Sequence, residues 1–498
     1  MLKPIDFILV ILYGFFVAGL GYWAKRLVKN PGDYFAGGKR VPWWLAAVSH
    51  HMSGYSALTF VGFGSLAYAS GFSAWTFFSL PIFLAMIIGA YVWAPRWSRM
   101  PVMTPVEYLE KRFNNTVRQL FAWSGIGIKF IDEGAKLYSL AVIVHVATHW
   151  PLPEVIVGCG IVTVLYLFFG GMWATVLTDF AQFVIQFSIT LIVVPLVFKM
   201  VGGVHGLVAQ MPAGSRGLFS NQVTPSFLFV YFFVILLSYN GGQWGLAQRF
   251  YSIGKPRDAR KAAFLSAFLF LLYPLAIFIP VWAARTVVGP VANGEHAYIL
   301  VAERVLSGIS PGFLGLLIAS MFAATMSMVD TDLNALAAVF TKDIYQRTFN
   351  PGASDALLLR IGMIATAVLG MLTIGAALLT IALQGAFKAS VEWFAAILGP
   401  VSIPLLLGMI YRKATWKGAL GAWFLGFGTF VLFKYGWPAW TGLPTSFALY
   451  TGMELLVSFV FFMVEGKISR RSPEEEARVQ QFFKQFQLDQ AQASAGPE

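Results

Sequence analysis

Charge and cysteine are both scarce in this sequence. Only 12% of the 498 residues are Asp, Glu, Lys or Arg, about half the share found in soluble domains. The single cysteine, Cys159, excludes an intrachain disulfide, and its apolar surroundings predict a packing role. A P-loop, a GxSxG motif, an HExxH motif and a nucleotide fingerprint are also absent. These absences exclude the common signatures of primary pumps and hydrolases, so we expect neither an enzyme nor an organic cofactor.

Long apolar runs, in contrast, occur along the whole chain. The composition is 58% hydrophobic, and runs of about 20 residues are long enough to cross a bilayer as helices. We expect an all-α integral membrane protein with about 13 transmembrane helices, because a soluble core explains one or two such runs at most. The expected spans are approximately residues 5–26, 42–70, 73–96, 117–147, 153–170, 172–200, 226–251, 258–288, 311–345, 355–383, 389–411, 416–436 and 443–465. A transmembrane domain of residues 1–465 is then followed by a polar cytoplasmic tail, residues 466–498.

The distribution of basic residues sets the expected orientation. A net charge of +12 suggests nucleic acid at first sight, but the basic residues lie in short loops between apolar runs, which is the positive-inside pattern. With an odd number of spans, these loops share one side if the N-terminus is outside and the C-terminus is cytoplasmic. We therefore expect a multi-pass monomer in the lipid bilayer of the cell inner membrane, without a nucleic-acid partner. The basic residues concerned are Lys25, Arg26, Lys39, Arg40, Arg96, Arg99, Lys111, Arg112, Arg249, Lys255, Arg257, Arg260, Lys261, Arg412, Lys413 and Lys417.

Two of the expected spans contain helix breakers near their middle. One carries the segment SHHMSGYS at residues 49–56, and the other carries SYNGGQ at residues 238–243. Polar residues and glycines at this depth are tolerated only where they line a protein cavity. The two spans are five apart in order, so residues 42–200 and 226–411 form two halves that each begin with a broken helix. Matched broken helices are typical of inverted-repeat transporters with a site at the repeat interface, and a pair of packing kinks is the alternative.

Ordered motifs resemble the sodium:solute symporter family, which includes the proline, galactose and sialic acid symporters. The motifs are HMSGY at 51–55, GGMW at 170–173 with TDFAQ at 178–182, QR at 248–249, and FAATMS at 322–327 with LN at 333–334 and KDIY at 342–345. The resemblance covers about residues 5–465. It implies a LeuT-like fold of two inverted five-helix repeats, with one helix before them and two after them, at residues 416–465. It also implies symport of a small solute with sodium by alternating access.

Helical spacing brings several oxygen-bearing side chains to one face of the span at residues 311–345. Ser327, Asp330, Thr331 and Asn334 recur at intervals of three and four residues. Oxygen ligands suit a hard cation, and a carboxylate inside a span usually marks an ion or proton path. Asp179 is the expected partner from another helix. The alternative role for Asp330 is capping or pairing, which is also what we expect of Asp332.

The family resemblance implies two cation sites. The family's common sodium site matches the carbonyls of Met52 and Tyr55, together with Ala324, Ser327 and Met328. Met328 departs from the family's serine, and a thioether is a poor sodium ligand, so this site lacks one ligand. A second site of some members matches Asp179, Ser327, Asp330 and Thr331, and here Asp330 replaces a hydroxyl. Sodium is the expected coupling ion, and a protonatable Asp330 leaves proton coupling open.

The expected solute site lies between the two broken helices and the helices that face them. Candidates from the broken helices are Ser53, Ser56, Thr59, Tyr239, Asn240 and Gln243. By resemblance, Tyr239 matches an aromatic gate of the galactose symporter, and a buried ring with a polar tip suits that role. Asp132 aligns with an arginine that holds the carboxylate of sialic acid, and Glu392 aligns near a sugar-binding glutamine. These carboxylates favour a solute with hydroxyl or amino groups, such as a sugar or an amino-acid-like metabolite.

Several of these charged and polar residues have a second interpretation. Lys129, Asp132, Glu133 and Lys136 are spaced to pair along a helix, so mutual neutralisation is as well supported as solute binding. The adjacent histidines at positions 50 and 51 lack metal-ligand spacing, so we expect them to line a cavity or to form hydrogen bonds. Two other functions stay open: a proton-coupled or uncoupled transporter of the same fold, and a membrane sensor of a small solute. The short tail argues against a sensor, because it has no room for a transmitter domain.

Overall fold

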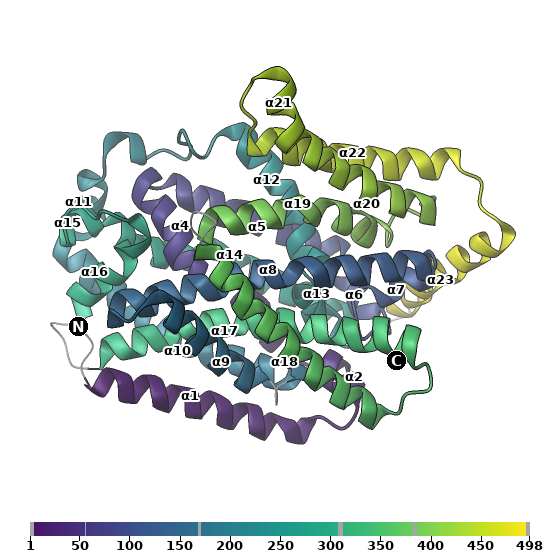
Figure 1. Ribbon diagram of the computed structural model, residues 1–498, viewed down its shortest axis with the longest axis horizontal. Helices are drawn as coiled ribbons and strands as arrows, with labels where there is room; N and C mark the ends of the chain where they lie inside the picture. Colours follow the sequence, from purple (N-terminus) through teal and green to yellow (C-terminus); the bar gives the residue numbers. More distant parts are fainter. Residues whose placement is uncertain (1–3, 55, 168–170, 307–311, 382–385, 495–498) are drawn as a thin grey trace.

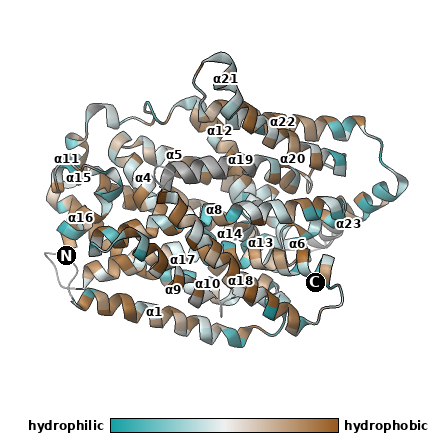
Figure 2. Cartoon of the chain, viewed as in Figure 1, coloured by the Kyte–Doolittle hydropathy of each residue, from teal (hydrophilic) through white to brown (hydrophobic). Residues whose placement is uncertain are grey.

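The structure is a computed structural model, and it describes residues 4–54, 56–167, 171–306, 312–381 and 386–494. This part of the chain is almost entirely helical (Figure 1), and its one β-type pairing is an isolated bridge between Arg40 and Ile253. Hydrophobic residues follow the long helices along their length, whereas the last helix is more hydrophilic (Figure 2). The expected all-α class is confirmed.

The chain up to residue 210 forms a leading helix and the helices of the first expected repeat. These are α1 (Pro4–Ala24), α2 (Pro31–Ala36), α3 (Trp43–Met52), α4 (Ala57–Ser70), α5 (Ser73–Val92), α6 (Ala94–Arg99), α7 (Glu107–Arg112), α8 (Asn115–Thr148), α9 (Leu152–Leu167), α10 (Gly171–Val201) and α11 (Gly203–Gln210).

The remainder of the chain forms the helices of the second expected repeat and a C-terminal group. These are α12 (Pro225–Leu237), the π-helical turn η4 (Ser238–Gly242), α13 (Trp244–Tyr251), α14 (Pro256–Trp282), α15 (Ala284–Val287), α16 (Ala297–Leu306), α17 (Phe313–Val339), η6 (Phe340–Phe349), α18 (Asp355–Thr380), α19 (Ala386–Leu407), α20 (Trp416–Val431), η8 (Leu432–Gly436), α21 (Trp437–Thr441), α22 (Phe447–Ile468) and α23 (Pro473–Ser494).

Helices of membrane-spanning length account for most of the expected spans. Within the described residues, 9 helical segments are long and apolar enough to cross a bilayer. The remaining expected spans coincide with helices that are broken, short or more polar, namely α3 with α4, α8, α9 and α19. Length and composition therefore confirm a helical fold with many spans, while the number 13 stays a prediction.

The first expected helix break lies between α3 and α4. Helix α4 begins after Ser56, whose backbone is extended and whose Oγ accepts a hydrogen bond from the Leu58 N–H at 3.2 Å. The N–H of Ala57 donates to Thr325 Oγ1 on α17, at 2.9 Å. These side-chain oxygens satisfy amides that the break removes from the helical ladder, which is the condition for irregular backbone at this depth.

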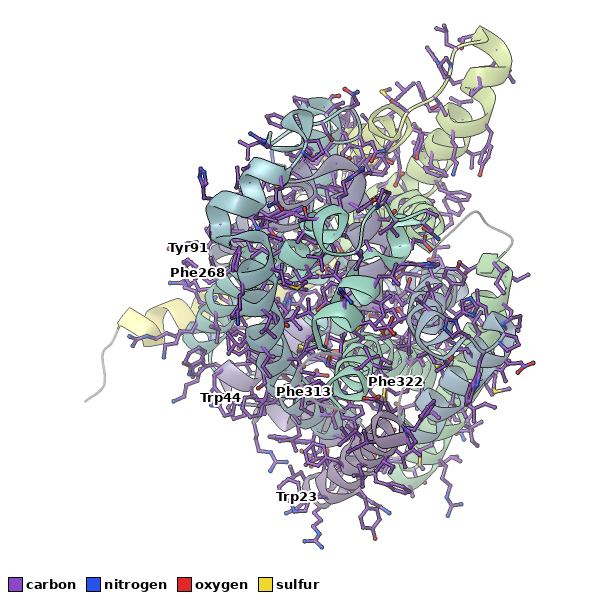
Figure 3. The ribbon with its side chains drawn as sticks, turned by 90° about the vertical axis from the view of Figure 1, so that its left-hand side faces the viewer. Trp23, Trp44, Tyr91, Phe268, Phe313 and Phe322 are labelled. Carbon is purple, nitrogen blue, oxygen red and sulfur yellow. The ribbon has the colours of Figure 1, made fainter. Side chains whose placement is uncertain are left out.

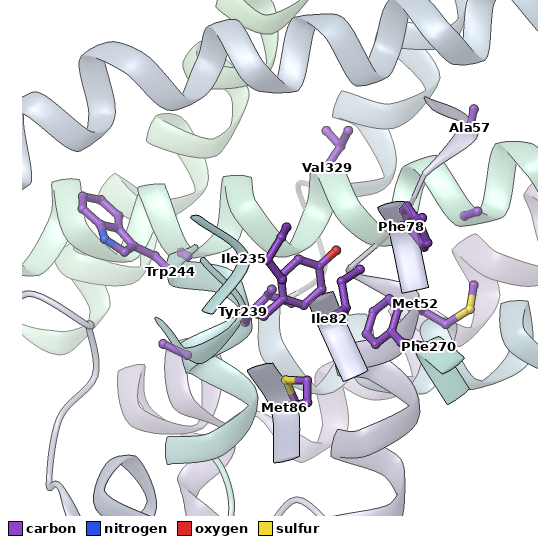
Figure 4. Packing of buried hydrophobic residues seen from close by; sticks show 14 of the residues in the cluster. Met52, Ala57, Phe78, Ile82, Met86, Ile235, Tyr239, Trp244, Phe270 and Val329 are labelled. Carbon is purple, nitrogen blue, oxygen red and sulfur yellow. The ribbon is translucent and has the colours of Figure 1, made fainter. Parts of the chain in front are cut away.

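The second break, at η4, meets the first. Gly241 has a φ of 139°, a conformation that glycine adopts without strain, and the Asn240 carbonyl accepts a hydrogen bond from Trp97 Nε1 at 2.8 Å. Tyr239 Oη donates to the Gly54 carbonyl at 2.6 Å, so the two breaks are joined directly. Figure 4 shows the Tyr239 ring among Ile82, Ile235 and other apolar side chains. Both expected breaks are confirmed.

Helix α17 forms the centre of the molecule. In its most apolar stretch 78% of the residues are buried, compared with 22% for α1, which lies along the outer edge in Figure 1. Helix α17 packs against α10 on one side and against α8 and α18 on others. Polar side chains of α17 are therefore enclosed by protein, and they have to find partners on these neighbours.

Candidate functional site

Two carboxylates of α17 face different neighbours. Asp330 lies on the side of α10, beside Asp179, whereas Asp332 reaches Lys129 and Lys136 on α8. Residues two apart on an α-helix are rotated by about 200° from each other, so one helix serves two separate clusters. Both carboxylates are buried. The predicted pairing role of Asp332 is confirmed, and Asp330 belongs to a different group.

The first group, which we call the Arg249 cluster, comprises Ser49, Ser53, Asp179, Arg249, Asp330 and Thr331. Arg249 Nη2 lies 3.1 Å from Asp179 Oδ2 and 3.1 Å from Ser53 Oγ, and it also donates to Thr331. Arg249 Nε donates to Ser49 Oγ at 2.8 Å, and Ser49 donates to Asp179. Ser53 Oγ and Thr331 Oγ1 are 2.8 Å apart. One guanidinium thus connects α3, α10, α13 and α17, as its planar fork of donors allows.

Three buried oxygens in or beside this cluster lack a hydrogen-bond partner among the described residues. They are Asp179 Oδ1, Ser327 Oγ and Asp330 Oδ2. Ser327 lies beside Asp179, and Asp330 uses its other oxygen, Oδ1, to accept from Thr331 at 3.3 Å. With two carboxylates and one guanidinium, the group carries a formal charge of −1 when both acids are ionised. Unpartnered buried oxygens are costly, and two carboxylates with a hydroxyl form a donor set that suits a hard cation.

The residues of the expected common sodium site are only partly described. Met52 ends α3, and Ala324, Ser327 and Met328 lie on α17, all of them buried. Tyr55 lies outside the described residues, so the carbonyl that it would supply cannot be placed. This site stays a prediction. Met328 supplies a thioether, which is a poor sodium ligand, so the predicted ligand set is incomplete.

The second group, which we call the Lys136 cluster, comprises Lys129, Asp132, Glu133, Lys136 and Asp332. Lys136 Nζ lies 2.8 Å from Asp132 Oδ2 and 3.2 Å from Asp332 Oδ2, and it also bonds Glu133. Lys129 Nζ lies 3.4 Å from Asp332 Oδ1. The three acids place oxygens within 4.8 Å of one another, and the ammonium of Lys136 contacts each acid. Of the pairs that helical spacing predicts, Asp132–Lys136 and Glu133–Lys136 are present, whereas Lys129, also predicted to pair with Asp132, forms an ion pair with Asp332 of α17.

The predicted solute-site residues divide into two sets. Asn240 donates through its amide to the carbonyls of Ala85, at 3.1 Å, and Leu236, at 2.8 Å, so it fastens η4 to α5. Ser56 caps α4, and Ser53 belongs to the Arg249 cluster. The others lie at the two breaks or on α8: Thr59 in α4, Tyr239 in η4, Gln243 immediately before α13, and Asp132 in the Lys136 cluster. The side chain of Glu392 in α19 lies outside the described residues.

Arg249 corrects an expectation from the sequence. It was expected in a basic loop after the seventh span, but it lies in α13 with 0% of its surface exposed. Arg112 departs from its expected loop role in the same way, because it is buried in α7 and donates to the carbonyls of Gly408, Tyr411 and Ala414. A signal for Arg249 was available, since a buried Asp179 needs a cationic or metal partner.

The two histidines are buried where α3 meets η4 and α14. His50 Nδ1 lies 2.9 Å from Ser266 Oγ, and its Nε2 lies 3.3 Å from the Tyr239 carbonyl. The His51 ring lies 4.6 Å from the ring of Phe270 and 5.7 Å from that of Tyr273. The predicted hydrogen-bonding role is confirmed for His50.

Comparison with known proteins agrees with this geometry. The sequence model of the sodium:solute symporter family matches residues 34–426, and the chain belongs to that family. It is 25% identical to a sodium/glucose cotransporter of Vibrio parahaemolyticus, over 84% of this chain and 83% of that protein. It is 26% identical to a sodium/sialic acid symporter of Aliivibrio fischeri, over 84% and 85% of the two chains.

Solved structures show the same fold. A sodium-coupled sialic acid symporter in a substrate-bound outward-open state superposes with a TM-score of 0.81 at 20% identity, covering 94% of this chain and 98% of that one. A nucleobase-cation symporter in a closed conformation gives a TM-score of 0.56 at 14% identity, over 91% and 99%. The protein is a multi-pass transporter with the LeuT-like fold that the motifs imply.

Proposed function

We propose that this protein is a secondary transporter that takes up a small polar solute together with sodium. Membership of the sodium:solute symporter family and the fold support this function. The observation that carries the choice of ion is the group of three unpartnered oxygens on Asp179, Ser327 and Asp330. Asp179 and Asp330 outnumber the single guanidinium, so a bound monovalent cation would bring the group to neutrality.

The cation site that we propose is the second site rather than the common one. Its ligands are Asp179 Oδ1, Ser327 Oγ and Asp330 Oδ2, and Thr331 supports it by bonding both Asp330 and Arg249. Met52, Tyr55 and Ala324 remain candidates for a further sodium at the common site. Met328 stands where the family has a serine, so the common site lacks one hydroxyl oxygen that could bind sodium. This absence favours the site that includes Asp330.

Uptake in proteoliposomes tests the coupling ion. Solute-dependent sodium-22 entry should be present, and it should disappear when Asp330→Asn removes one proposed ligand. Replacing sodium by choline over a range of pH should abolish solute uptake at every pH. Full uptake without sodium that follows the proton gradient would instead assign proton coupling to Asp330.

We place the solute between the two breaks and α8. Tyr239 and Gln243 border this region from the second broken helix, Asp132 borders it from α8, and Glu392 belongs to the facing helix α19. Carboxylates and a tyrosine hydroxyl suit a solute with hydroxyl or amino groups, such as a sugar or an amino-acid-like metabolite. The amide nitrogen of Asn240 already bonds two carbonyls, which gives it a structural role, whereas its Oδ1 has no hydrogen-bond partner among the described residues and stays a candidate for binding the solute.

A thermal-shift screen tests the solute class. Sugars, amino acids and nucleosides are added to the purified protein with and without sodium, because a ligand of the native state raises the apparent melting temperature by mass action. A true solute should give a larger shift in sodium than in choline. If Asp132→Asn and Glu392→Gln both transported that solute normally, the site would lie elsewhere.

The location that we propose is the cell inner membrane, with the N-terminus outside and the C-terminus cytoplasmic. The two five-helix repeats span residues 42–200 and 226–411, and the basic loops support this orientation. In a chain whose Cys159 is replaced by alanine, Ala292→Cys should react with an impermeant maleimide on intact cells. Lys413→Cys should react only after lysis, and the reverse pattern would invert the topology.

A further inference from the structure

A basic cavity of about 890 Å³ lies where the ends of α5, α14 and α19 meet α6 and α23. Six of the cations that line it are Lys39, Arg96, Arg99, Lys255, Arg257 and Arg260, and Arg412 joins them from the turn after α19. Among the described residues of its wall there is no carboxylate. The positive-inside pattern explains cations on this side of the protein, but it does not require them to converge on one cavity.

Aromatic rings and a backbone carbonyl hold several of these cations in place. The Arg260 guanidinium lies 5.2 Å from the centre of the Tyr91 ring, and the Arg412 guanidinium lies 5.1 Å from that of Phe483. Lys39 Nζ donates to the Ser98 carbonyl at 2.7 Å. Partial burial, together with the charge of Arg99, lowers the pKa of Arg96. An anion in the cavity would therefore relieve repulsion that is already present.

An exposed apolar track leads away from this cavity along α5 and α14. Its members recur every three or four residues on the outer faces of the two helices: Leu84, Ile88 and Tyr91 on α5, and Phe268 and Leu272 on α14. Figure 3 shows Tyr91 and Phe268 at the same edge of the molecule. Phe264 connects the two helices, with its ring 5.5 Å from that of Tyr91. Tyr91 belongs to both the track and the cavity wall.

We propose that this cavity binds the headgroup of an anionic phospholipid, whose acyl chains lie on the apolar track of α5 and α14. The phosphate meets the converging arginines, and the hydrocarbon covers side chains that face the bilayer. Basic pockets at the cytoplasmic side of membrane helices are a recognised form of lipid headgroup site. A free phosphorylated metabolite would use the same cations, but it would leave the apolar track without a role.

Lipid titration of the purified full-length protein in detergent tests the proposal, with retained lipid counted by native mass spectrometry. The probes are phosphatidylglycerol and phosphatidylcholine with identical acyl chains. The wild type should retain phosphatidylglycerol preferentially. The double variant Arg257→Gln/Arg260→Gln should weaken this binding by roughly tenfold or more, since each basic residue near a headgroup contributes substantially. The matched control Lys25→Gln/Arg26→Gln, which removes the same charge from exposed positions outside the cavity, should change it little.

A second pair of measurements separates a lipid from a soluble anion. Leu84→Ser/Leu272→Ser should weaken phosphatidylglycerol binding several-fold, and millimolar inorganic phosphate should fail to displace the lipid. Equal retention of the two lipids, equal loss in the control variant, or displacement by phosphate with no effect of the track variant would overturn the proposal.

Discussion

The Arg249 and Lys136 clusters lie on different sides of the same helix and carry the same formal charge. In each, carboxylates outnumber cations by one: Asp179 and Asp330 against Arg249, and Asp132, Glu133 and Asp332 against Lys129 and Lys136. In the Lys136 cluster the central ammonium contacts all three acids. In the Arg249 cluster the guanidinium forms an ion pair with Asp179, whereas one oxygen each of Asp179 and Asp330 has no hydrogen-bond partner among the described residues.

The difference shows two ways of placing buried carboxylates. In the Lys136 cluster the side chains of the protein itself contact every acid, whereas in the Arg249 cluster some carboxylate oxygens stay available to bind an ion. A flexible ammonium can be surrounded by acids, as Lys136 is. A planar guanidinium has a fixed direction, and Arg249 is directed toward Ser49, Ser53 and Thr331. Ser327 Oγ and Asp330 Oδ2 accept no hydrogen bond from this guanidinium. We expect an exchangeable ion to bind at these two oxygens.

Removing the central cation of either cluster should lower the stability of the protein more than any other change considered below. Arg249→Met and Lys136→Met each leave buried carboxylates without their cation, which costs about 3–5 kcal/mol. Lys136→Met should be the worse, because it exposes three acids to one another. Thermal unfolding in detergent measures the loss. Adding Glu133→Gln to Lys136→Met should recover part of it, and a failure to recover any would contradict the charge-balance explanation.

Replacing the arginine by lysine, or the lysine by arginine, should lower stability less than removing the cation does. Arg249→Lys places a compact ammonium where a fork now bonds Ser49, Ser53, Asp179 and Thr331, so stability should fall by about 1–2 kcal/mol through lost charge-assisted hydrogen bonds. Lys136→Arg keeps the charge of its cluster and serves as the reciprocal exchange. If thermal unfolding showed no cost for Arg249→Lys, the directional role of the guanidinium would be refuted.

Neutralising the two acids of α17 should separate ion binding from structure. Sodium at about 100 times its dissociation constant stabilises a binding protein by about 2.7 kcal/mol, and Asp330→Asn should abolish that increment. Asp332→Asn is the matched control, since it should destabilise the Lys136 cluster yet keep the sodium-dependent shift in melting temperature. A sodium shift that survived Asp330→Asn and vanished in Asp332→Asn would move the ion site to the other cluster.

The smallest effect is expected for the hydroxyl next to Asp179. Ser327 Oγ lies beside Asp179 but makes no close hydrogen bond among the described residues, so Ser327→Ala should lower stability without sodium by about 1 kcal/mol or less. It should still raise the sodium concentration for half-maximal uptake several-fold. Ser320→Ala on the same helix, where the hydroxyl bonds the Leu317 carbonyl at 2.7 Å, should leave that concentration unchanged.

Local patterns in the sequence were sufficient to predict the helix breaks and two of the ion pairs within α8. Glycines and polar residues at 49–56 and 238–243 mark both breaks, and spacings of three and four residues give the Asp132–Lys136 and Glu133–Lys136 pairs. The Arg249 partners could not be predicted in this way. They lie on helices that are distant in sequence, and a basic residue close to an expected loop is assigned to that loop by the positive-inside pattern.

Asn240 shows a second limit of sequence reasoning. A polar residue at a helix break is a reasonable ligand candidate, yet its amide bonds the carbonyl of Leu236 in its own helix and that of Ala85 in α5. The two helical segments approach closely here, because a Cβ atom at Gly89 would clash with Asn240 Oδ1. The two carbonyl contacts account for the amide nitrogen, whereas Asn240 Oδ1 has no hydrogen-bond partner among the described residues, so its solute-binding role stays a prediction that only the packing of α5 against η4 could refine.

The position of Arg249 also has a kinetic consequence. Its guanidinium extends from α13 and bonds both α3 and α17. A motion that separates α3 from α17 must break the contact between Ser53 Oγ and Thr331 Oγ1, and it must detach Arg249 Nη2 from one of these hydroxyls, because that atom bonds both. Hydrogen bonds to a buried charged group are costly to break. We therefore expect any transport step that separates these two helices to be slowed by the Arg249 cluster.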